Sequence, residues 1–422
     1  MDEHFLHYIW KHQKYTTHDL RLTNGQTLKV FHQGFHNDDS GPDFEEARIK
    51  IDDIEWAGCI EIHIKSSDWY SHGHGSDKAY GNVILHVVWL HDREVLTEEM
   101  NIPTLEIKSI VDPELIGRYS LHVSHSGRIA CSSQLKQITA IKYQSMLDRV
   151  LVERLEEKAR RVLNILSQTN NDWESTSYQI FARNFGFSTN KAVFEQLSFK
   201  LPFEILKKNL PNRLKTEALL FGQAGFLDKA SDTYQKELQA EFHFLKSKYE
   251  LKDAMNKSVW KFGRMRPANF PSVRLAQFAA LLHQNAGLFS RIISIERSKD
   301  LITSIKINYP PYWQSHYDFG KLRKSTSKCP GNNTLDNILI NSVSPILSAY
   351  SKFSGEQRYM DRAISLLEAI KPEANRHTKE WEKLDRKPVS AFESQAQIQL
   401  IRHYCERRKC LDCNIGVHLL TK

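Results

Sequence analysis

The sequence predicts an α+β protein in which a mixed β-sheet domain, residues 1–130, precedes a large, mainly α-helical region, residues 131–422. Short runs of alternating apolar and polar residues fill the first part, whereas helical spacing dominates the second. Composition changes at the same place: residues 1–130 contain 13 of the 19 histidines, and 12 Lys and Arg against 21 Asp and Glu. The remainder contains 46 Lys and Arg against 29 Asp and Glu, so an acidic, histidine-rich part precedes a basic one.

The first domain begins with a short helix and continues with strands. Residues 3–12 carry their apolar side chains on one broad helical face, and TNGQ at 23–26 is a hairpin signal. NVILHVVWL is mostly apolar, which is typical of a strand buried on both faces. Strands are expected at residues 28–34, 44–52, 55–65, 82–90 and 104–109. The expected order is therefore a helix, three strands, an irregular connection and a further strand.

From about residue 135 the spacing predicts helices. The first is long and charged, over YQSMLDRVLVERLEEKARRVLNIL. The segment RMRPANFPSVRLAQFAALLHQ starts with a proline-rich turn and enters a helix at about Ser272. Further helices are expected at residues 175–186, 190–199, 214–225, 236–251, 333–353 and 359–370.

GCIEIHIKSSDWYSHGHGSD at 58–77 gathers ionisable side chains of metal-binding and proton-transferring kinds. Because side chains alternate along a strand, three isoleucines face one side, and Glu61, His63 and Lys65 face the other. Such a row is costly to bury without partners, and a bound cation and a polyanionic substrate would provide them. The alternative is an amphipathic edge strand whose polar face lies in water. His86, inside VILHVVW, is expected to be a core histidine rather than a ligand.

GPDF at 41–44 lies seventeen residues before Glu61. A Gly-Pro-Asp entry to one strand, then an acidic residue and a base two positions later on the next, resembles the PD-(D/E)xK nuclease superfamily. The core of that superfamily is a helix, three strands, a helix and a fourth strand. The resemblance implies a restriction-endonuclease-like domain in which Asp43 and Glu61 hold Mg²⁺ or Mn²⁺, ions that prefer oxygen ligands.

The same resemblance assigns roles to the residues that follow. The residue two after the acidic one would be the base or would stabilise the transition state, and here it is His63 instead of lysine, with Lys65 two further along the same face. Some very-short-patch-repair-like members carry a histidine and an aspartate after the acidic strand residue. By that likeness His72 or His74, with Asp77, would assist catalysis. The alternative is a polar loop whose histidines cap turns.

Nearly the whole chain is also similar to an uncharacterised bacterial family described as a domain of unknown function. The phrases that carry this likeness are GPDFEEARIKI, EIHIKSSDWYSHGH, AYGNVILHVV, RPANFPSVRLAQFAALL and YCERRKCLDCNIG. The likeness implies no activity.

HYCERRKCLDCNIG places Cys405, Cys410 and Cys413 in a C-x4-C-x2-C spacing. A C-x2-C step lets two sulfur atoms grip one ion, and the three-cysteine spacing also occurs in iron–sulfur proteins. Cys131 is the preferred fourth ligand, with Cys329 as the alternative, and a histidine, His403 or His418, would instead complete a zinc site. Zinc, an iron–sulfur cluster and reduced structural thiols all remain open.

The basic part contains two candidate nucleic-acid-binding segments. RMRPANFPSVR sets arginines around two prolines and an aromatic residue, and DFGKLRKSTSKCPGNN sets lysines and an arginine beside small residues. Both suit phosphate and base contacts, with solvated loops as the alternative. GKLRKST lacks the G-x-x-x-x-G-K spacing of a P-loop, which argues against nucleotide hydrolysis. The candidate binding residues are Arg264, Arg266, Arg274, Lys321, Arg323 and Lys324.

Two functions from different classes follow from these patterns. The first is a divalent-metal-dependent nuclease, or nuclease-derived protein, acting on DNA or RNA. The second is a non-catalytic nucleic-acid-binding or scaffold protein that keeps the fold, and a metal-dependent hydrolase of another ester is a weaker third. No run approaches the roughly 20 apolar residues of a membrane span, and the N-terminus lacks signal-peptide order, so no membrane partner and a cytoplasmic location are expected.

Overall fold

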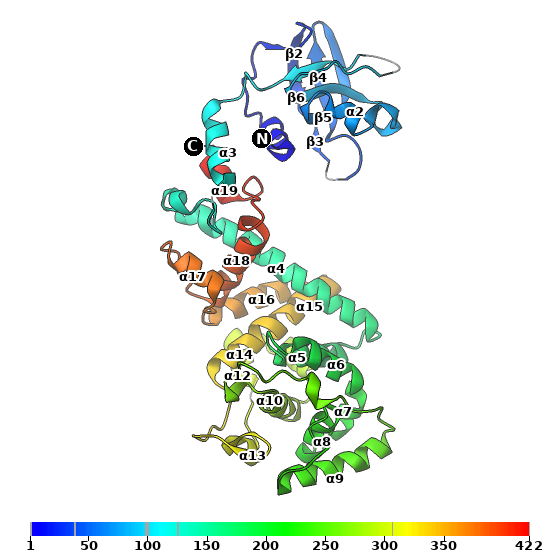
Figure 1. The fold of residues 1–422 in the computed structure, drawn as a ribbon, viewed down its shortest axis with the longest axis vertical. Coiled ribbons are helices and arrows are strands. Elements are labelled where there is room, and N and C mark those ends of the chain that lie inside the picture. Colours follow the sequence, from blue (N-terminus) through cyan, green and yellow to red (C-terminus); the bar gives the residue numbers. More distant parts are fainter. Residues whose placement is uncertain (1, 38, 98–100, 125, 306, 422) are drawn as a thin grey trace. The chain divides into compact units, whose positions relative to one another are not determined.

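The computed structural model describes residues 2–37, 39–97, 101–124, 126–305 and 307–421 (Figure 1). The chain divides into two compact units. The sheet unit comprises Met1–Met146 and Ile401–Lys422, and the helical unit comprises Leu147–Leu400. The expected boundary at residue 130 falls inside the sheet unit, which also takes the C-terminal segment with its three cysteines.

The sheet unit is built on a mixed sheet, as the sequence predicts. The strand order is β1-β2-β4-β5-β6-β7, and β3 pairs with β4. The pairs β1–β2, β2–β4 and β4–β5 are antiparallel, whereas β5–β6 and β6–β7 are parallel. The strands are β1 Leu20–Arg21, β2 Thr27–His32, β3 Phe35–His36, β4 Phe44–Ile51, β5 Ile54–Lys65, β6 Val83–Leu90 and β7 Thr104–Glu106.

The central strand β5 follows the alternation read from the sequence. Ile60 and Ile62 are fully buried in the main core, together with Phe5 and Ile9 of α1, Glu3–Lys11. Burying each large aliphatic side chain contributes about 1.5–3 kcal/mol to folding. The isoleucine face therefore anchors β5, and the polar side chains that alternate with it have a fixed direction.

The parallel pairing of β5 and β6 requires a crossover, because the chain must return to the same end of the sheet. Residues 66–82 form it, with helix α2, Asp68–Ser71, and the turns η1, His74–Ser76, and η2, Lys78–Tyr80. Helix α2 packs against β5. The irregular connection with a helical turn agrees with the sequence prediction.

The remaining elements of the sheet unit come from distant parts of the chain. Helix α19 contacts α3, and Leu411 and Leu420 join the same core as the sheet. These elements are α3 Pro113–Ser124, η3 Ser132–Gln137, η7 Ile401–Cys405 and α19 Asn414–Leu420.

The helical unit is mainly α-helical, as predicted, with one two-stranded ribbon formed by β8, His316–Asp318, and β9, Lys321–Leu322. The long helix α4, Ala140–Gln168, begins in the sheet unit and continues here. Side-chain caps start several helices, and α17 has a full capping box on Asn375. The other helices are α5 Trp173–Phe185, α6 Lys191–Lys200, α7 Phe203–Asn209, α8 Arg213–Gln223, α9 Thr233–Lys248, α10 Pro271–Gln284, α11 Leu288–Ser294, α12 Ser298–Ser304, α13 Pro311–Ser315, α14 Asn332–Ile338, α15 Ser344–Ser354, α16 Arg358–Ala369, α17 Arg376–Glu382 and α18 Ala391–Leu400.

Across the described ranges, none of the helices combines the length and the apolar composition that crossing a bilayer requires.

Candidate metal centre

Strand β5 carries two buried polar side chains on the face opposite its isoleucines. Glu61 is 4% exposed and His63 is 1% exposed. Because β5 lies between β4 and β6, this face is an interior surface and the edge-strand alternative does not hold. Buried groups of this kind need partners, and histidines from the crossover supply them.

Three histidine donor atoms lie close together in this region, and the Glu61 carboxyl group lies beside two of them. His63 Nε2 is 3.1 Å from His72 Nδ1 and 3.5 Å from Glu61 Oε1. His74 Nε2 is 3.2 Å from Glu61 Oε1, and the ligand atoms of the three histidines all lie within 4.8 Å of one another. A tetrahedral ion with bonds of about 2.0–2.1 Å to nitrogen separates its donors by about 3.3 Å. The metal-centre cluster is therefore formed by the imidazoles of His63, His72 and His74, with the Glu61 carboxyl group beside two of them.

The crossover is shaped to present two of these histidines. Gly73, between them, has a φ of 77°, a left-handed conformation that a residue with a side chain rarely adopts. The Tyr80 ring stacks on His74 with centroids 3.8 Å apart, and Trp69 of α2 lies edge-on to the same imidazole. His74 Nε2 is buried and finds no hydrogen-bond partner in the described part of the chain. An orphaned imidazole nitrogen facing a carboxylate is satisfied by a cation.

His86 orients His63 from the neighbouring strand. Glu61 and His86 are register partners in the parallel pair β5–β6, and His63 Nδ1 lies 2.8 Å from His86 Nε2. When His63 Nδ1 carries the proton and donates it to His86 Nε2, His63 Nε2 is unprotonated and available to a metal. The sequence prediction of a core histidine holds, since His86 is fully buried.

Replacing His86 by phenylalanine is expected to weaken metal binding about 10–100-fold, because a lost orienting partner typically costs that much. Competition titration against a chelator measures the affinity, and thermal unfolding of the variant checks its folding. His18→Phe, at an exposed position of the same unit, is the matched control. Unchanged affinity in His86→Phe would show that His63 does not depend on this contact.

Asp43 joins the cluster from the Gly-Pro-Asp turn before β4. Its backbone N–H donates to Glu61 Oε2 at 3.2 Å, and its Oδ2 accepts from the Ile62 N–H at 2.9 Å. His7 Nε2 of α1 lies 3.3 Å from the same Oδ2. Asp43 and Glu61 are therefore on the same side of the sheet, and one carboxylate oxygen of Asp43 is held in place by backbone and imidazole.

The ionisation of the cluster reflects its burial. Burial, followed by the nearby carboxylate of Asp43, raises the pKa of Glu61 to about 9. Burial, followed by the neighbouring imidazoles, lowers the pKa of His63 to about 2 and that of His86 to about 3. Without a cation the carboxyl group is protonated and these imidazoles are neutral at pH 7, so metal uptake would release a proton.

The other two predicted catalytic residues, Lys65 and Asp77, lie at exposed positions outside the metal-centre cluster. Lys65 is at the exposed end of β5, where its backbone N–H donates to Asp68 Oδ2. Asp77 is exposed and caps η2 by accepting from the Ala79 N–H. Its carboxylate is near enough to favour the charged form of His74, but burial is the larger influence and lowers the pKa of that imidazole.

Sequence reasoning missed His7, which holds Asp43. His7 and Glu3 are four residues apart on α1 and so share a face. Burial, followed by the Asp43 carboxylate, raises the pKa of Glu3, which places that residue beside the cluster as well. The i, i+4 pair of an acid and a histidine on the first helix was the available signal.

The predicted cysteines gather at a second place in the sheet unit. Cys405, Cys410 and Cys413 are buried, and Cys131 is partly buried. The Arg408 guanidinium ties the two segments together by donating to the carbonyl oxygens of Gly127 and Cys405 at 2.9 and 3.2 Å. Burial, followed by the thiolates of Cys413 and Cys410, raises the pKa of Cys131 to about 12. Burial, followed by Cys413 and Cys131, raises the pKa of Cys405, and burial and Cys413 raise that of Cys410 to about 11.

The six predicted nucleic-acid-binding residues separate into two groups. Arg264, Arg266 and Arg274 line one pocket of the helical unit. Lys321 pairs with Asp318 at 3.4 Å, and the Arg323 Nε donates to the His316 carbonyl oxygen at 2.7 Å. Lys324 follows and is exposed. Cys329 is also exposed and belongs to the helical unit, which leaves Cys131 as the neighbour of the C-terminal thiols.

A family model described as "Protein of unknown function (DUF2851)" matches residues 3–376. The matched range includes the metal-centre cluster and the three pocket arginines, and it ends before Cys405. No curated protein and no solved structure matches the chain.

Proposed function

Since the chain belongs to the family of proteins of unknown function DUF2851, we propose its activity from the site itself: a divalent-metal-dependent nuclease that hydrolyses phosphodiester bonds of DNA or RNA. One observation carries the proposal. Asp43 and Glu61 meet on one side of the sheet beside three imidazoles whose donor atoms lie within 4.8 Å. Carboxylates and imidazoles at this spacing are the ligands of a hydrolytic metal site.

The arrangement of elements supports a restriction-endonuclease-like domain. A helix, three antiparallel strands, a crossover with a helix and a parallel strand occur in the order α1, β2, β4, β5, α2 and β6. Asp43 precedes the second of these strands and Glu61 lies in the third. This is where the superfamily resemblance requires the two acidic residues.

The residue types fit a metal ion, and they favour a transition metal over Mg²⁺. Imidazole suits softer divalent ions, whereas Mg²⁺ demands oxygen ligands. Of the two ions expected from the sequence, Mg²⁺ and Mn²⁺, the site therefore suits Mn²⁺ better, and Zn²⁺ is a further candidate. Glu61, His63, His72 and His74 would hold the ion, with Asp43 beside it as a second carboxylate. When bound, such an ion lowers the pKa of a water molecule and screens the scissile phosphate. His7 and the Ile62 N–H hold Asp43, and His86 orients His63.

The proposal predicts cleavage of some form of nucleic acid with Mn²⁺ or Zn²⁺, weaker cleavage with Mg²⁺, and none with a chelator. Gel assays on single-stranded, double-stranded and branched DNA and RNA test it. Binding should weaken as salt rises, because the basic residues displace counterions from phosphates. If every substrate binds with that salt dependence and stays intact with all three metals, the protein is a non-catalytic nucleic-acid scaffold. The histidine in place of lysine at position 63 is the observation that favours this alternative.

We further propose that Cys131, Cys405, Cys410 and Cys413 hold a second, structural metal centre. Within the described ranges, no three of these sulfur atoms lie within 4.8 Å of one another. Thiolates on one tetrahedral zinc ion lie about 3.8 Å apart. In an iron–sulfur cluster each cysteine binds a different iron atom, so the sulfurs are further apart. A spacing beyond 4.8 Å fits such a cluster better than a single zinc ion, and it fits four reduced thiols equally well.

A further inference from the structure

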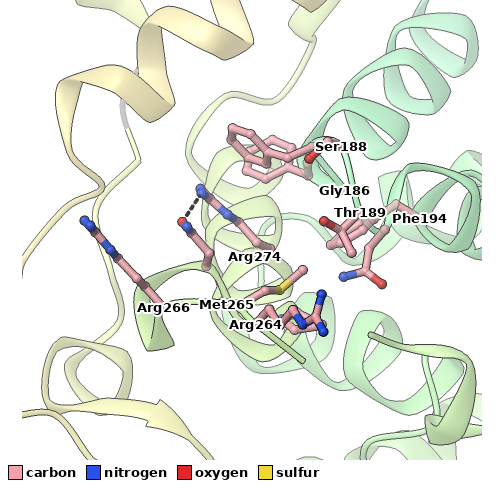
Figure 2. A pocket seen from close by; sticks show the side chains of 13 residues that line it. Gly186, Ser188, Thr189, Phe194, Arg264, Met265, Arg266 and Arg274 are labelled. Atoms are coloured by element: carbon pink, nitrogen blue, oxygen red, sulfur yellow. Dashed lines mark hydrogen bonds between the residues drawn. The ribbon is translucent and has the colours of Figure 1, made fainter. Parts of the chain in front are cut away.

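The helical unit contains a pocket whose floor is a buried arginine. Arg274 of α10 is only 6% exposed, although arginine is among the residues least often buried without an ionic partner. The pocket above it has a volume of about 420 Å³, within the range of small-molecule sites. Figure 2 shows Arg274 between the segment with Gly186, Ser188 and Thr189 and the segment with Arg264, Met265 and Arg266.

Neutral groups hold the Arg274 guanidinium in place. Nη1 donates to Gln277 Oε1 at 2.7 Å and to Thr334 Oγ1 at 3.2 Å, and Nη2 donates to Asn269 Oδ1 at 2.7 Å. The Phe187 ring covers the guanidinium with a centroid distance of 3.8 Å. In the described chain, no carboxylate lies within ion-pair distance of Arg274, so its charge is fixed in position but not neutralised.

Further residues of this pocket add positive charge and hydrogen-bond donors. Arg264 and Arg266 are exposed there, as are the hydroxyl groups of Ser188 and Thr189. No Asp or Glu is among the residues that line the described pocket. Because the oxygen of the Asn269 amide accepts from Arg274, the NH₂ group of this pocket-lining residue is a further donor. Three arginines, two hydroxyls and no acid suit a compact dianion better than a monovalent carboxylate.

We propose that this pocket binds a phosphomonoester, the group that terminates a nucleic-acid strand. The inference rests on the proposed function for that choice of ligand. A partly enclosed pocket with one buried guanidinium suits a terminal phosphate, because an internal phosphodiester carries one charge and two chain continuations that the pocket would have to admit. The three arginines that the sequence predicts as a general nucleic-acid-binding surface would thus bind the terminal phosphate of a strand.

The test compares oligonucleotides of one sequence that carry a phosphate or a hydroxyl at the 5′ or the 3′ end. Fluorescence anisotropy is measured with a chelator present, so the result does not depend on cleavage and separates this inference from the nuclease proposal. We expect the full-length protein to prefer one phosphorylated end at least about tenfold, because hydrogen bonds to charged groups are strong. Arg274→Met, which keeps length without charge, and Arg266→Gln, at the exposed rim, should each remove the preference. Lys236→Met, at an exposed position of α9, should retain it.

Inorganic phosphate and a mononucleotide are the remaining probes. Either should raise the melting temperature of the wild-type protein and compete with the phosphorylated end, but should leave Arg266→Gln unchanged. A mononucleotide that binds as tightly as the strand would support the phosphomonoester site and identify a free nucleotide as its source. Equal affinity for phosphate and hydroxyl ends, with no protection by phosphate or mononucleotide, would overturn the proposal. Arg274 would then only join α10 to its neighbours.

Discussion

Replacing Glu61 by glutamine is expected to lower the rate of nucleic-acid cleavage at least about 1000-fold, a transition-state cost of about 4 kcal/mol. The amide keeps the shape of the side chain but cannot ionise to bind the metal ion, although its oxygen position stays 3.5 Å from His63 Nε2 and 3.2 Å from His74 Nε2. Nucleic-acid affinity should change little, because the proposed binding surface is in the helical unit. Single-turnover cleavage and anisotropy binding measure the two quantities separately.

Glu55→Gln is the matched control for this experiment. Glu55 lies on the same strand, is exposed, and pairs with Arg48 at 3.8 Å on the surface. Surface pairs of this kind contribute little, so the control should cut at the wild-type rate. Cleavage at the wild-type rate by the Glu61→Gln variant would show that the metal-centre cluster takes no part in the reaction. Loss of cleavage in both variants would indicate a general effect of charge on the strand.

The strand that carries the site could be predicted because its pattern is local. Alternation alone puts Glu61 and His63 opposite the isoleucines, and the turn residues around them bound the strand. The same alternation put Lys65 on the correct face and at the end of the expected strand, without showing that this end is exposed. Periodicity gives the direction of a side chain but not how far the covered part of the sheet extends.

The partners of these residues could not be predicted, because they depend on pairing between distant segments. His86 meets His63 through the register of a parallel pair, and that register is set by the crossover and the core. His7 reaches Asp43 because α1 packs near the turn before β4, a tertiary contact. In the helical unit, Ser188 and Thr189 come to the arginine pocket from a loop that lies 82 residues before the start of α10, counted from Thr189 to Pro271.

The cysteines combine a local pattern, which the sequence predicts, with a distant contact, which depends on the fold. The C-x4-C-x2-C spacing identified three of them, since nine residues cannot separate those thiols widely. The preference for Cys131 over Cys329 had no physical reason until the fold showed that the chain returns after residue 400 to the sheet unit, which contains Cys131. Gly416 illustrates how tightly it returns, since a Cβ there would lie 2.2 Å from the Cys410 carbonyl oxygen.

Replacing Cys410 by serine is expected to lower metal content and stability together, because binding by a structural metal centre is coupled to folding. A loss of about 3 kcal/mol would lower the melting temperature of a unit of this size by roughly 6–12 °C. Elemental analysis gives the metal and its stoichiometry, and the visible absorption spectrum separates an iron–sulfur cluster from colourless zinc. Preparation without oxygen protects a cluster from loss before measurement.

Cys329→Ser controls for the substitution itself, since Cys329 is exposed and lies in the helical unit. It should leave metal content and melting temperature at the wild-type values. Iron with matching sulfide in the wild type, reduced in Cys410→Ser and retained in Cys329→Ser, is the expected result. Zinc in place of iron would show that the four sulfurs draw closer when the ion binds. Wild-type metal content and melting temperature in Cys410→Ser would mean that the four thiols are packed as buried side chains, stabilised by the apolar core around Leu411 and Leu420 rather than by a metal.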